Sequence, residues 1–182
     1  MTMYIHGLES KQQRNRGAAG RKIMNYQQQI PLMTKGHGDM LNITEQVAAI
    51  VTSSGIRAGT VNVFNVGSTA AVGTIEFEPG LQHDLPAILD RLIPPSRNYG
   101  HEQAWQDGNG HSHLQATLLG PSLTVPIADG KLVLGTWQQI FHLECDVRGR
   151  RRCQSGGRRS RSWLSPSRYW LLLRWWCQPQ SG

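Results

Sequence analysis

The sequence predicts an α+β fold: a compact single domain with a curved, mostly antiparallel β-sheet of half-barrel or sandwich-like form and two main helices. Three observations point to this class. Several short segments alternate apolar and polar residues with period two, two segments space their apolar residues as helices do, and most strands follow one another instead of alternating with helices. The chain of 182 residues suits one ordinary domain. It contains no run of about 18 apolar residues that would predict a membrane-spanning helix.

Local signals predict the elements of the first half. A strand is expected over 26–34, and a helix begins at Thr44, a suitable N-cap, and ends at Gly55, which favours a helix end. The segment T-V-N-V-F-N-V at 60–66 alternates with period two, which predicts a strand with valines on one face.

The second half contains one more predicted helix and then only strands. The helix covers 84–92, with Pro86 tolerated in its first turn, and the Asp129-Gly130 pair is typical of a hairpin turn. A polar loop at 96–110 separates the helix from the later strands. The predicted strands of this half cover 70–77, 111–119, 123–127, 131–134 and 138–146.

Charge is segregated along the chain. Residues 1–23 carry +4, residues 24–146 carry −6 and residues 147–182 carry +9, which together give the net charge of +7. The basic pI of about 9.8 therefore belongs to the two ends. For this reason we expect neither a nucleic-acid nor a membrane partner for the domain itself.

The composition predicts three regions. Residues 1–23 are interpreted as a disordered basic extension, with Met24 as the biological start and a real basic arm as the alternative. Residues 24–152 form the predicted domain. Residues 153–182 are rich in Arg and Trp without a period, and we interpret them as non-native, for instance from a shifted reading frame, or disordered. An Arg/Trp arm that binds a membrane surface or nucleic acid is the alternative.

Three cysteines are too few for a disulfide framework, and no apolar leader precedes the first patterned segment. We therefore expect a cytoplasmic protein.

Histidines cluster in the segment H-E-Q-A-W-Q-D-G-N-G-H-S-H at 101–113. On the predicted strand, His111 and His113 are two residues apart, so their side chains would leave the same face. His101 could fold back across the glycine-rich loop, so that three imidazoles bind one metal ion and leave a fourth position open, as in a catalytic zinc or iron site. The alternative is a pair of exposed histidines on a solvated strand. The carboxylates that could join or orient such ligands are Glu76, Glu102 and Asp107.

Two turns are candidates for holding an anion. Gly108-Asn109-Gly110 could present backbone N–H groups, and Ser68 and Thr69 could present hydroxyl groups. In both cases a simple tight turn is the alternative explanation, and neither segment is a P-loop.

Four motifs resemble those of the YjbQ family, whose members are sometimes called secondary thiamine-phosphate synthases. They are G-S-T-A-A at 67–71, G-N-G-H-S-H at 108–113, G-P-S-L-T-V-P at 120–126 and L-G-T-W-Q at 134–138. The resemblance covers roughly residues 26–152. It implies an α+β fold, a homotrimer with sites near the subunit interfaces and, in some members, a metal bound by histidines.

The resemblance also implies roles for individual residues. His101 and His113 match histidines of the family's site, and Glu76 matches a glutamate, so these three would be catalytic. Many members have a histidine where this chain has Gly67, and many have an acidic residue where His111 stands. We expect His111 to replace the imidazole absent at Gly67; a remodelled site with a different activity, or none, is the alternative.

The end of the domain departs from the family pattern. Members usually continue past an arginine-rich turn, here 148–152, into a final valine-rich strand, whereas this chain continues with C-Q-S-G-G. Loss of that strand would expose a sheet edge.

The activity implied by the resemblance joins a pyrimidine diphosphate to a thiazole phosphate with loss of pyrophosphate. A phosphate-containing small molecule is thus the expected partner, beside the other copies of a homotrimer. The expected cofactor is a divalent metal: zinc or iron would suit imidazole ligands, and magnesium would suit phosphate oxygens. The predicted metal ligands are His101, His111 and His113, and the predicted phosphate-binding residues are Ser68, Thr69, Asn109 and Gly110. The alternatives are a metal-dependent hydrolase and a non-enzymatic trimer that binds a metal or small ligand.

Overall fold

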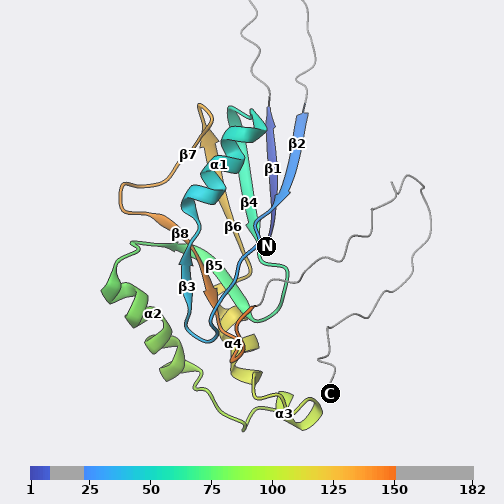
Figure 1. The fold of residues 1–182 in the computed structure, drawn as a ribbon, viewed down its shortest axis with the longest axis vertical. Helices are drawn as coiled ribbons and strands as arrows, with labels where there is room; N and C mark the ends of the chain where they lie inside the picture. Colours follow the sequence, from blue (N-terminus) through green and yellow to red (C-terminus); the bar gives the residue numbers. More distant parts are fainter. Residues whose placement is uncertain (9–22, 151–182) are drawn as a thin grey trace, which may run out of the picture. The chain divides into compact units, whose positions relative to one another are not determined.

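Residues 1–8 and 23–150, the part of the chain that the computed structural model describes, form two antiparallel β-sheets and four helices (Figure 1). The five-stranded sheet has the order β2-β1-β4-β6-β7, and the three-stranded sheet has the order β3-β8-β5. The larger sheet consists of β1 (Thr2–Leu8), β2 (Ile23–Gln29), β4 (Ala58–Phe64), β6 (Ser122–Ala128) and β7 (Lys131–Leu132). The smaller sheet consists of β3 (Met40–Asn42), β5 (Ala70–Ile75) and β8 (Gln139–Glu144). The helices are α1 (Thr44–Ser54), α2 (Pro79–Leu92), α3 (His101–Ala104) and α4 (Gly110–Leu119).

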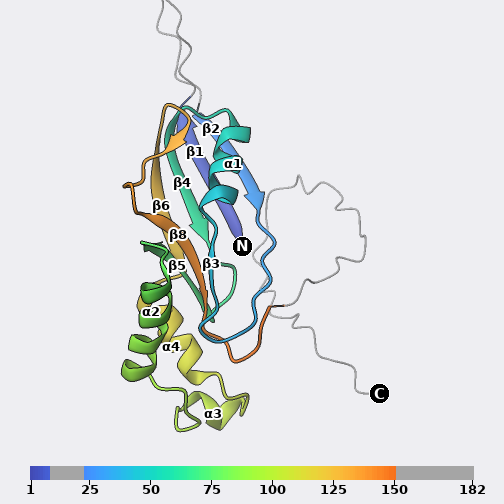
Figure 2. The same cartoon turned by 60° about the vertical axis from the view of Figure 1, so that its left-hand side comes forward.

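This arrangement confirms the predicted α+β class: every strand pair is antiparallel, and neither sheet closes on itself. It divides the predicted single sheet into two. Helix α1 covers the larger sheet, whereas α2, α3 and α4 lie at the other end (Figure 2). None of the helices in the described ranges is long and apolar enough to cross a bilayer.

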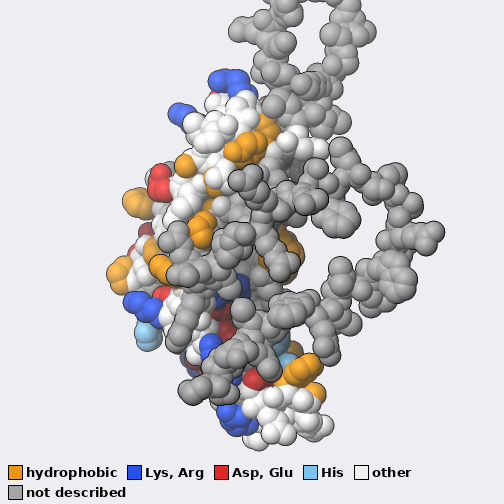
Figure 3. Space-filling view, turned by 45° about the vertical axis from the view of Figure 1, so that its right-hand side comes forward, with side chains coloured by type: hydrophobic (Ala, Val, Ile, Leu, Met, Phe, Trp, Pro, Cys, Tyr) orange, Lys and Arg blue, Asp and Glu red, His pale blue; other side chains and the backbone are white. Residues whose placement is uncertain are grey.

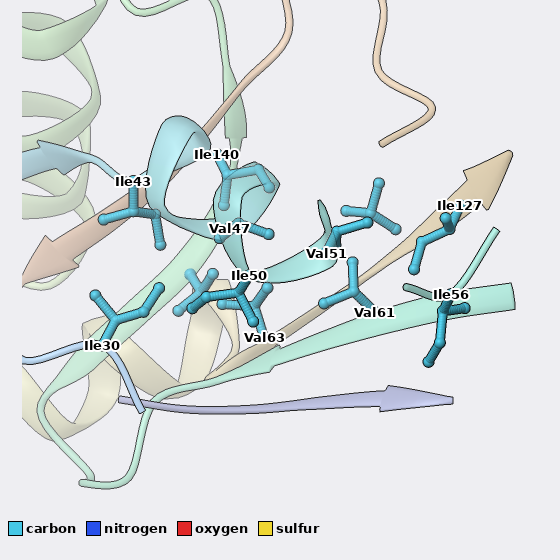
Figure 4. Packing of buried hydrophobic residues seen from close by; sticks show 12 residues of the cluster. Ile30, Ile43, Val47, Ile50, Val51, Ile56, Val61, Val63, Ile127 and Ile140 are labelled. Atoms are coloured by element: carbon cyan, nitrogen blue, oxygen red, sulfur yellow. The ribbon is translucent and has the colours of Figure 1, made fainter. Parts of the chain in front are cut away.

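The main apolar core lies between α1 and the larger sheet. The period-two pattern of β4 places Val61 and Val63 inward, both fully buried, as the sequence predicts. In Figure 4 they lie opposite Val47 and Val51 of α1. Each fully buried valine contributes roughly 1.5–3 kcal/mol relative to an exposed one. The remaining buried members of this core are Ile30, Ile43, Ile50, Ile56, Val72, Val125, Ile127 and Ile140.

Helix α1 covers the predicted residues, but Thr44, the predicted N-cap, is its first helical residue, and the N-cap is Ile43. Oδ1 of Asn42 accepts hydrogen bonds from the backbone N–H and the hydroxyl of Thr44, at 3.0 and 2.7 Å. The Thr44 hydroxyl in turn accepts the N–H of Ile140 at 2.8 Å, which fastens α1 to β8. Gly55 closes the helix with a left-handed backbone, φ 69°.

The predicted hairpin is also present. Asp129 and Gly130 both have positive φ, 52° and 78°, as a tight two-residue turn between β6 and β7 requires.

The predicted strand over 111–119 is wrong, because these residues belong to α4. Ala116 and Leu119 are three positions apart, and both pack into a second apolar cluster beneath the smaller sheet. That cluster also contains Leu89 of α2 and Phe141 of β8. A helical stripe therefore buries more apolar surface here than period-two alternation would.

Helix α2 is longer than predicted. It begins at Pro79, and the Glu78 carboxylate accepts the N–H groups of Gly80 and Leu81 at 2.7 and 2.5 Å. Pro86 therefore lies in the helix interior instead of the first turn, where it removes one backbone donor.

The predicted disorder of residues 1–23 does not hold for Thr2–Leu8, which form β1. This strand lies between β2 and β4 and pairs with both along its whole length. Residues 9–22 lie outside the described part, as does the predicted non-native tail at 153–182. Both edges of β4 are thus paired, by β1 and by β6.

We expect a variant that lacks residues 1–22 to lose stability. Removal of β1 leaves one edge of β4 unpaired and leaves β2 without the one strand that it pairs with among the described residues. At about 1 kcal/mol net for each backbone hydrogen bond, the free energy of unfolding should fall by roughly 3 kcal/mol or more. Urea unfolding of the two chains measures the difference, and size-exclusion chromatography reports self-association through the open edge. Equal stability of the two chains would contradict a structural role for β1.

Candidate functional site

Polar side chains gather where the ends of β5 and β8 meet the N-terminal half of α4. The histidines visible on the face in Figure 3 lie in its lower half, among acidic and basic side chains. The buried polar residues of this region are Thr34, Asn65, Glu102, Asn109, His111, Ser112, Gln115, His142 and Glu144. Buried polar groups are costly unless they are paired, so their partners define the site.

The first part of the site is a network around Glu144, whose side chain is fully buried. Its carboxylate accepts the hydroxyl of Thr34 at 3.0 Å, Nε of Arg150 at 2.6 Å and the N–H of Asp146 at 3.2 Å. Thr34 also accepts the N–H of Arg150 and donates its own N–H to the Arg150 carbonyl, at 2.8 and 3.2 Å. The buried charge is therefore paired and hydrogen-bonded, as stability requires.

The second part of the site is His37, which lies in the same loop as Thr34. Its Nδ1 lies 3.0 Å from the carbonyl oxygen of Cys145, and its Nε2 lies 2.9 Å from Oδ1 of Asp90. A carbonyl and a carboxylate can only accept hydrogen bonds, so both bonds form together only when His37 is an imidazolium. Gln115 donates to the same Asp90 oxygen and to the Ile93 carbonyl, each at 2.9 Å, which fixes the counter-ion of His37.

The third part is His111, which is buried beside His37. The two rings are 5.2 Å apart between centroids and meet edge to face. Burial and the neighbouring His37 lower the pKa of His111 against a smaller upward effect of nearby carboxylates. The ring is thus held neutral. Its Nε2 lies 3.4 Å from the hydroxyl of Ser112, and its Nδ1 has no partner among the described residues.

His101 and His113 form a separate pair. Their ring centroids are 4.6 Å apart, and both side chains are half-buried. His101 Nε2 lies 3.4 Å from Oδ1 of Asp107, but neither atom has a well-aligned hydrogen bond. The helix explains the separation: two positions apart on a helix is about 200° around the axis, so His111 and His113 leave opposite faces of α4.

The glycine-rich loop surrounds a carboxylate of the chain itself. Buried Glu102 accepts the N–H of Gly108 at 2.9 Å and the N–H of Gly110 at 3.2 Å. The backbone donor that the sequence assigns to a substrate phosphate at Gly110 is therefore already engaged. Asn109 is buried and donates to Asp146 at 3.4 Å, and its Oδ1 has no hydrogen-bond partner in the described part of the chain.

The predicted metal ligands are not assembled into one group. His101 and His113 lie together, while His111 faces His37. Within residues 1–8 and 23–150, no three His, Cys, Asp or Glu side chains are arranged to hold a metal ion.

Glu76, the predicted third catalytic residue, lies apart from these histidines. It is exposed and follows Ile75, at the opposite end of β5 from the Ala70–Glu144 pair. It thus lies at the other end of the smaller sheet from the Glu144 network.

The turn after β4 lies close to the Glu144 network. A side chain at Gly67 would meet the Nη atoms of Arg150 at 3.2 and 3.3 Å and Nδ2 of Asn65 at 3.6 Å. His111 is not among these nearest neighbours, so the structure gives no support to the idea that it replaces an imidazole at Gly67. Ser68 is exposed and Thr69 is half-buried in this turn.

Sequence reasoning missed several residues of the site. His37 has a side chain only 24% exposed and is paired at both nitrogens. Asp90 and Gln115 carry no local signal, because their partners are far along the chain. Glu144 does carry one: a single charge inside the apolar run F-H-L-E-C of a strand must find a buried partner.

Fold and site together define an α+β protein with two open antiparallel sheets and a histidine-rich polar site at one end. Residues 28–155, well over half of the chain, match the family described as "UPF0047 protein YjbQ-like". The chain belongs to this UPF0047/YjbQ family, which confirms the resemblance seen in its motifs.

Relatives and solved structures agree with this assignment. The chain is 43% identical over 121 residues to a UPF0047 protein of Methanothermobacter thermautotrophicus, covering 66% of this chain and 83% of that protein. It is 28% identical over 127 residues to the UPF0047 protein YjbQ of Escherichia coli O157:H7, covering 69% and 91%. A crystal structure of a YbjQ-like protein of unknown function from Sulfolobus solfataricus aligns with TM-score 0.59 and 40% identity, covering 62% of this chain and 81% of that one.

His142 makes stability depend on pH. Burial, together with the positive charges of Arg150 and the N-terminus, lowers its pKa to about 4, and its Nε2 donates to Oδ1 of Asn65 at 3.2 Å. Since the unfolded chain takes up this proton near pH 6.5, stability should fall as the pH drops from about 6.5 to about 4, by about 3 kcal/mol in total.

We expect the variant His142→Gln to flatten this dependence, because a glutamine cannot titrate. Urea unfolding at several pH values between 7 and 4 measures the slope. His83→Gln is the matched control, since the His83 side chain is 81% exposed. Equal slopes for the two variants would mean that His142 does not carry the effect.

Cys145 should be inert in the folded protein. Burial, with the nearby negative charges of Glu144 and Asp90, raises its pKa to about 12, so the thiolate is scarce at neutral pH. Iodoacetamide at pH 8 should leave Cys145 unmodified in native protein and modify it in urea, as read by peptide mass spectrometry. Rapid labelling of this peptide in native protein would contradict the buried placement.

Proposed function

We propose that this chain binds a phosphate-containing small molecule at the histidine-rich site and joins a pyrimidine diphosphate to a thiazole phosphate. The observation that carries the proposal is the pair of half-buried His37, bonded at both ring nitrogens, and buried His111, whose pKa is lowered; the two ring centroids lie 5.2 Å apart. Membership of the YjbQ family supports the choice of substrates through the activity that the resemblance implies.

The reaction needs a cation more than a base. A lone pair on the thiazole nitrogen forms the new C–N bond while the bond between the pyrimidine methylene carbon and the diphosphate oxygen breaks. The pyrophosphate leaves with that electron pair, and no proton is removed from the nucleophile. The chief demand on the protein is therefore to stabilise negative charge on the leaving group.

His37 and His111 suit this demand in different ways. His37 supplies a ring whose position is fixed by Asp90 and the Cys145 carbonyl before any substrate binds, and the ring is a cation when both of its nitrogens carry a proton. The unpartnered Nδ1 of His111 can donate to a phosphate oxygen in the tautomer that carries the proton there. Unpartnered Oδ1 of Asn109 can accept from a substrate amino group.

A divalent metal stays a prediction to which we assign no step. Zinc or iron would need the three imidazoles in one place, and His111 lies on the opposite face of α4 from His113. The described donors of this chain do not fit that role.

We also propose a homotrimer, as the family resemblance implies. The side chains of Trp137 and Val133, in the segment between β7 and β8, are 69% and 53% exposed, which leaves apolar surface for a subunit contact to cover.

The test is turnover with both precursors. The full chain is incubated with the pyrimidine diphosphate, the thiazole phosphate and Mg²⁺, and thiamine phosphate and pyrophosphate are both quantified. We expect His37→Gln and His111→Gln to lower kcat about tenfold or more, because each removes a fixed interaction with developing charge. His83→Gln, which replaces an exposed histidine, should match the unchanged chain.

The other outcomes separate the alternatives. Release of phosphate without joined product would indicate a hydrolase, and binding of the precursors without any product would indicate a ligand-binding protein. Equal kcat for His37→Gln and His83→Gln would remove the proposed role of the histidine pair.

A further inference from the structure

We propose that Arg150 and the turn at 67–69 form a subsite that binds a terminal phosphate group of the ligand. The subsite rests on the proposed function only in that both assume a ligand that carries phosphate. It adds a residue and a turn that lie outside the histidine pairs.

Arg150 is held in place by three bonds. Its backbone N–H and carbonyl are both bonded to Thr34, at 2.8 and 3.2 Å, and its Nε donates to buried Glu144 at 2.6 Å. An arginine attached through Nε keeps the outer edge of its guanidinium, with both Nη atoms, in a fixed direction. The ordering of this long side chain is thus achieved by the fold, before a ligand arrives.

The Nη atoms face the turn and are unused within the described part of the chain. They have no hydrogen bond or ion pair with another residue of 1–8 or 23–150, and the side chain is 28% exposed. Gly67 stands directly beside them: a Cβ there would lie only 3.2 and 3.3 Å from the two atoms. The missing side chain therefore makes room for the guanidinium itself, which lies against the turn at 67–69.

The turn at 67–69 is held through its backbone carbonyls, so its side-chain hydroxyls can still bond a ligand. The side-chain amide of Asn65 donates to the carbonyls of Gly67 and Ala70, at 3.0 and 3.2 Å, and the carbonyl of Thr69 accepts the N–H of Cys145 at 2.9 Å. The hydroxyls of Ser68 and Thr69 make no hydrogen bond to other residues of the described ranges.

The Nη atoms of Arg150 and the hydroxyls of the turn are donors of the kind that bind a phosphate group. The two Nη atoms form a planar fork that can bond two phosphate oxygens at once, and neighbouring hydroxyls can donate to the third. Glu144 bonds only Nε of the Arg150 guanidinium, so the donors on both Nη atoms stay available to a ligand.

The test is binding of inorganic pyrophosphate to the full chain by isothermal titration calorimetry. Arg150→Lys keeps a positive charge for Glu144 and removes the fork, and we expect the affinity to fall about tenfold or more. Arg148→Lys is the matched control, since Arg148 is exposed and, among the described residues, only its backbone N–H is bonded, to Asp146. Equal affinity of a folded Arg150→Lys and the unchanged chain would overturn the subsite, as would absence of pyrophosphate binding by the unchanged chain.

A second variant decides the case if Arg150→Lys does not fold. Ser68→Ala/Thr69→Val removes only the two hydroxyls of the turn, and we expect a several-fold loss of affinity; unchanged affinity would then overturn the subsite. The calorimetric experiment needs no turnover. Failure of the transfer reaction with intact, Arg150-dependent binding would thus reject the proposed reaction alone.

Discussion

The carboxylate of Glu144 is the charge on which this end of the molecule depends. A buried carboxylate without partners would cost several kcal/mol. It is satisfied by the Thr34 hydroxyl, by Arg150 and by the N–H of Asp146. Thr34 is 110 positions away along the chain, so the need to pair one charge brings a distant loop against the end of β8. The two bonds between Thr34 and Arg150, from the Arg150 N–H to the Thr34 hydroxyl and from the Thr34 N–H to the Arg150 carbonyl, are possible only with that loop in place.

The histidine pair follows from the same attachment. The loop that carries Thr34 continues to His37, which bonds the carbonyl of Cys145, the residue next to Glu144. His37 then bonds Asp90 of α2, and Asp90 bonds Gln115 of α4. One chain of polar contacts thus orders β8, the 34–39 loop and two helices around His111. Loss of Asp90 or Thr34 would leave a bond to buried Gln115 or buried Glu144 unmade, which is the costly case.

The fold was predictable from the sequence where local signals sufficed. Helix α1 has a polar residue at its start and a terminal glycine, β4 has strict alternation, and the hairpin has its Asp129-Gly130 turn. Each of these elements can therefore be predicted from a few adjacent residues. Helix α4 cannot be predicted in this way, because its helical state depends on Ala116 and Leu119 packing beneath the smaller sheet and on the contact between Gln115 and Asp90. Strand β1 forms because it pairs with the edge of β4, and no local pattern in residues 2–8 predicts this pairing.

The same limit applies to the site. The sequence predicts that His101 and His113 lie together, but the pairing of His37 with Asp90, 53 positions apart, depends on the tertiary structure.

The change of His111 and His113 from strand to helix alters what the site can do. On a strand the two rings would share one face and form a natural pair of metal ligands, whereas α4 directs one ring inward to His37 and the other outward to His101. The glycine-rich loop, which on sequence grounds could hold an anion, is filled by Glu102. What is left for a ligand are groups whose positions are already fixed: the His37 ring with its Asp90 partner, and the outer edge of Arg150 with Glu144 behind it. Because these carboxylates hold their partners in place, a phosphate would meet oriented donors and would not have to order them. That arrangement favours stabilisation of a charged leaving group.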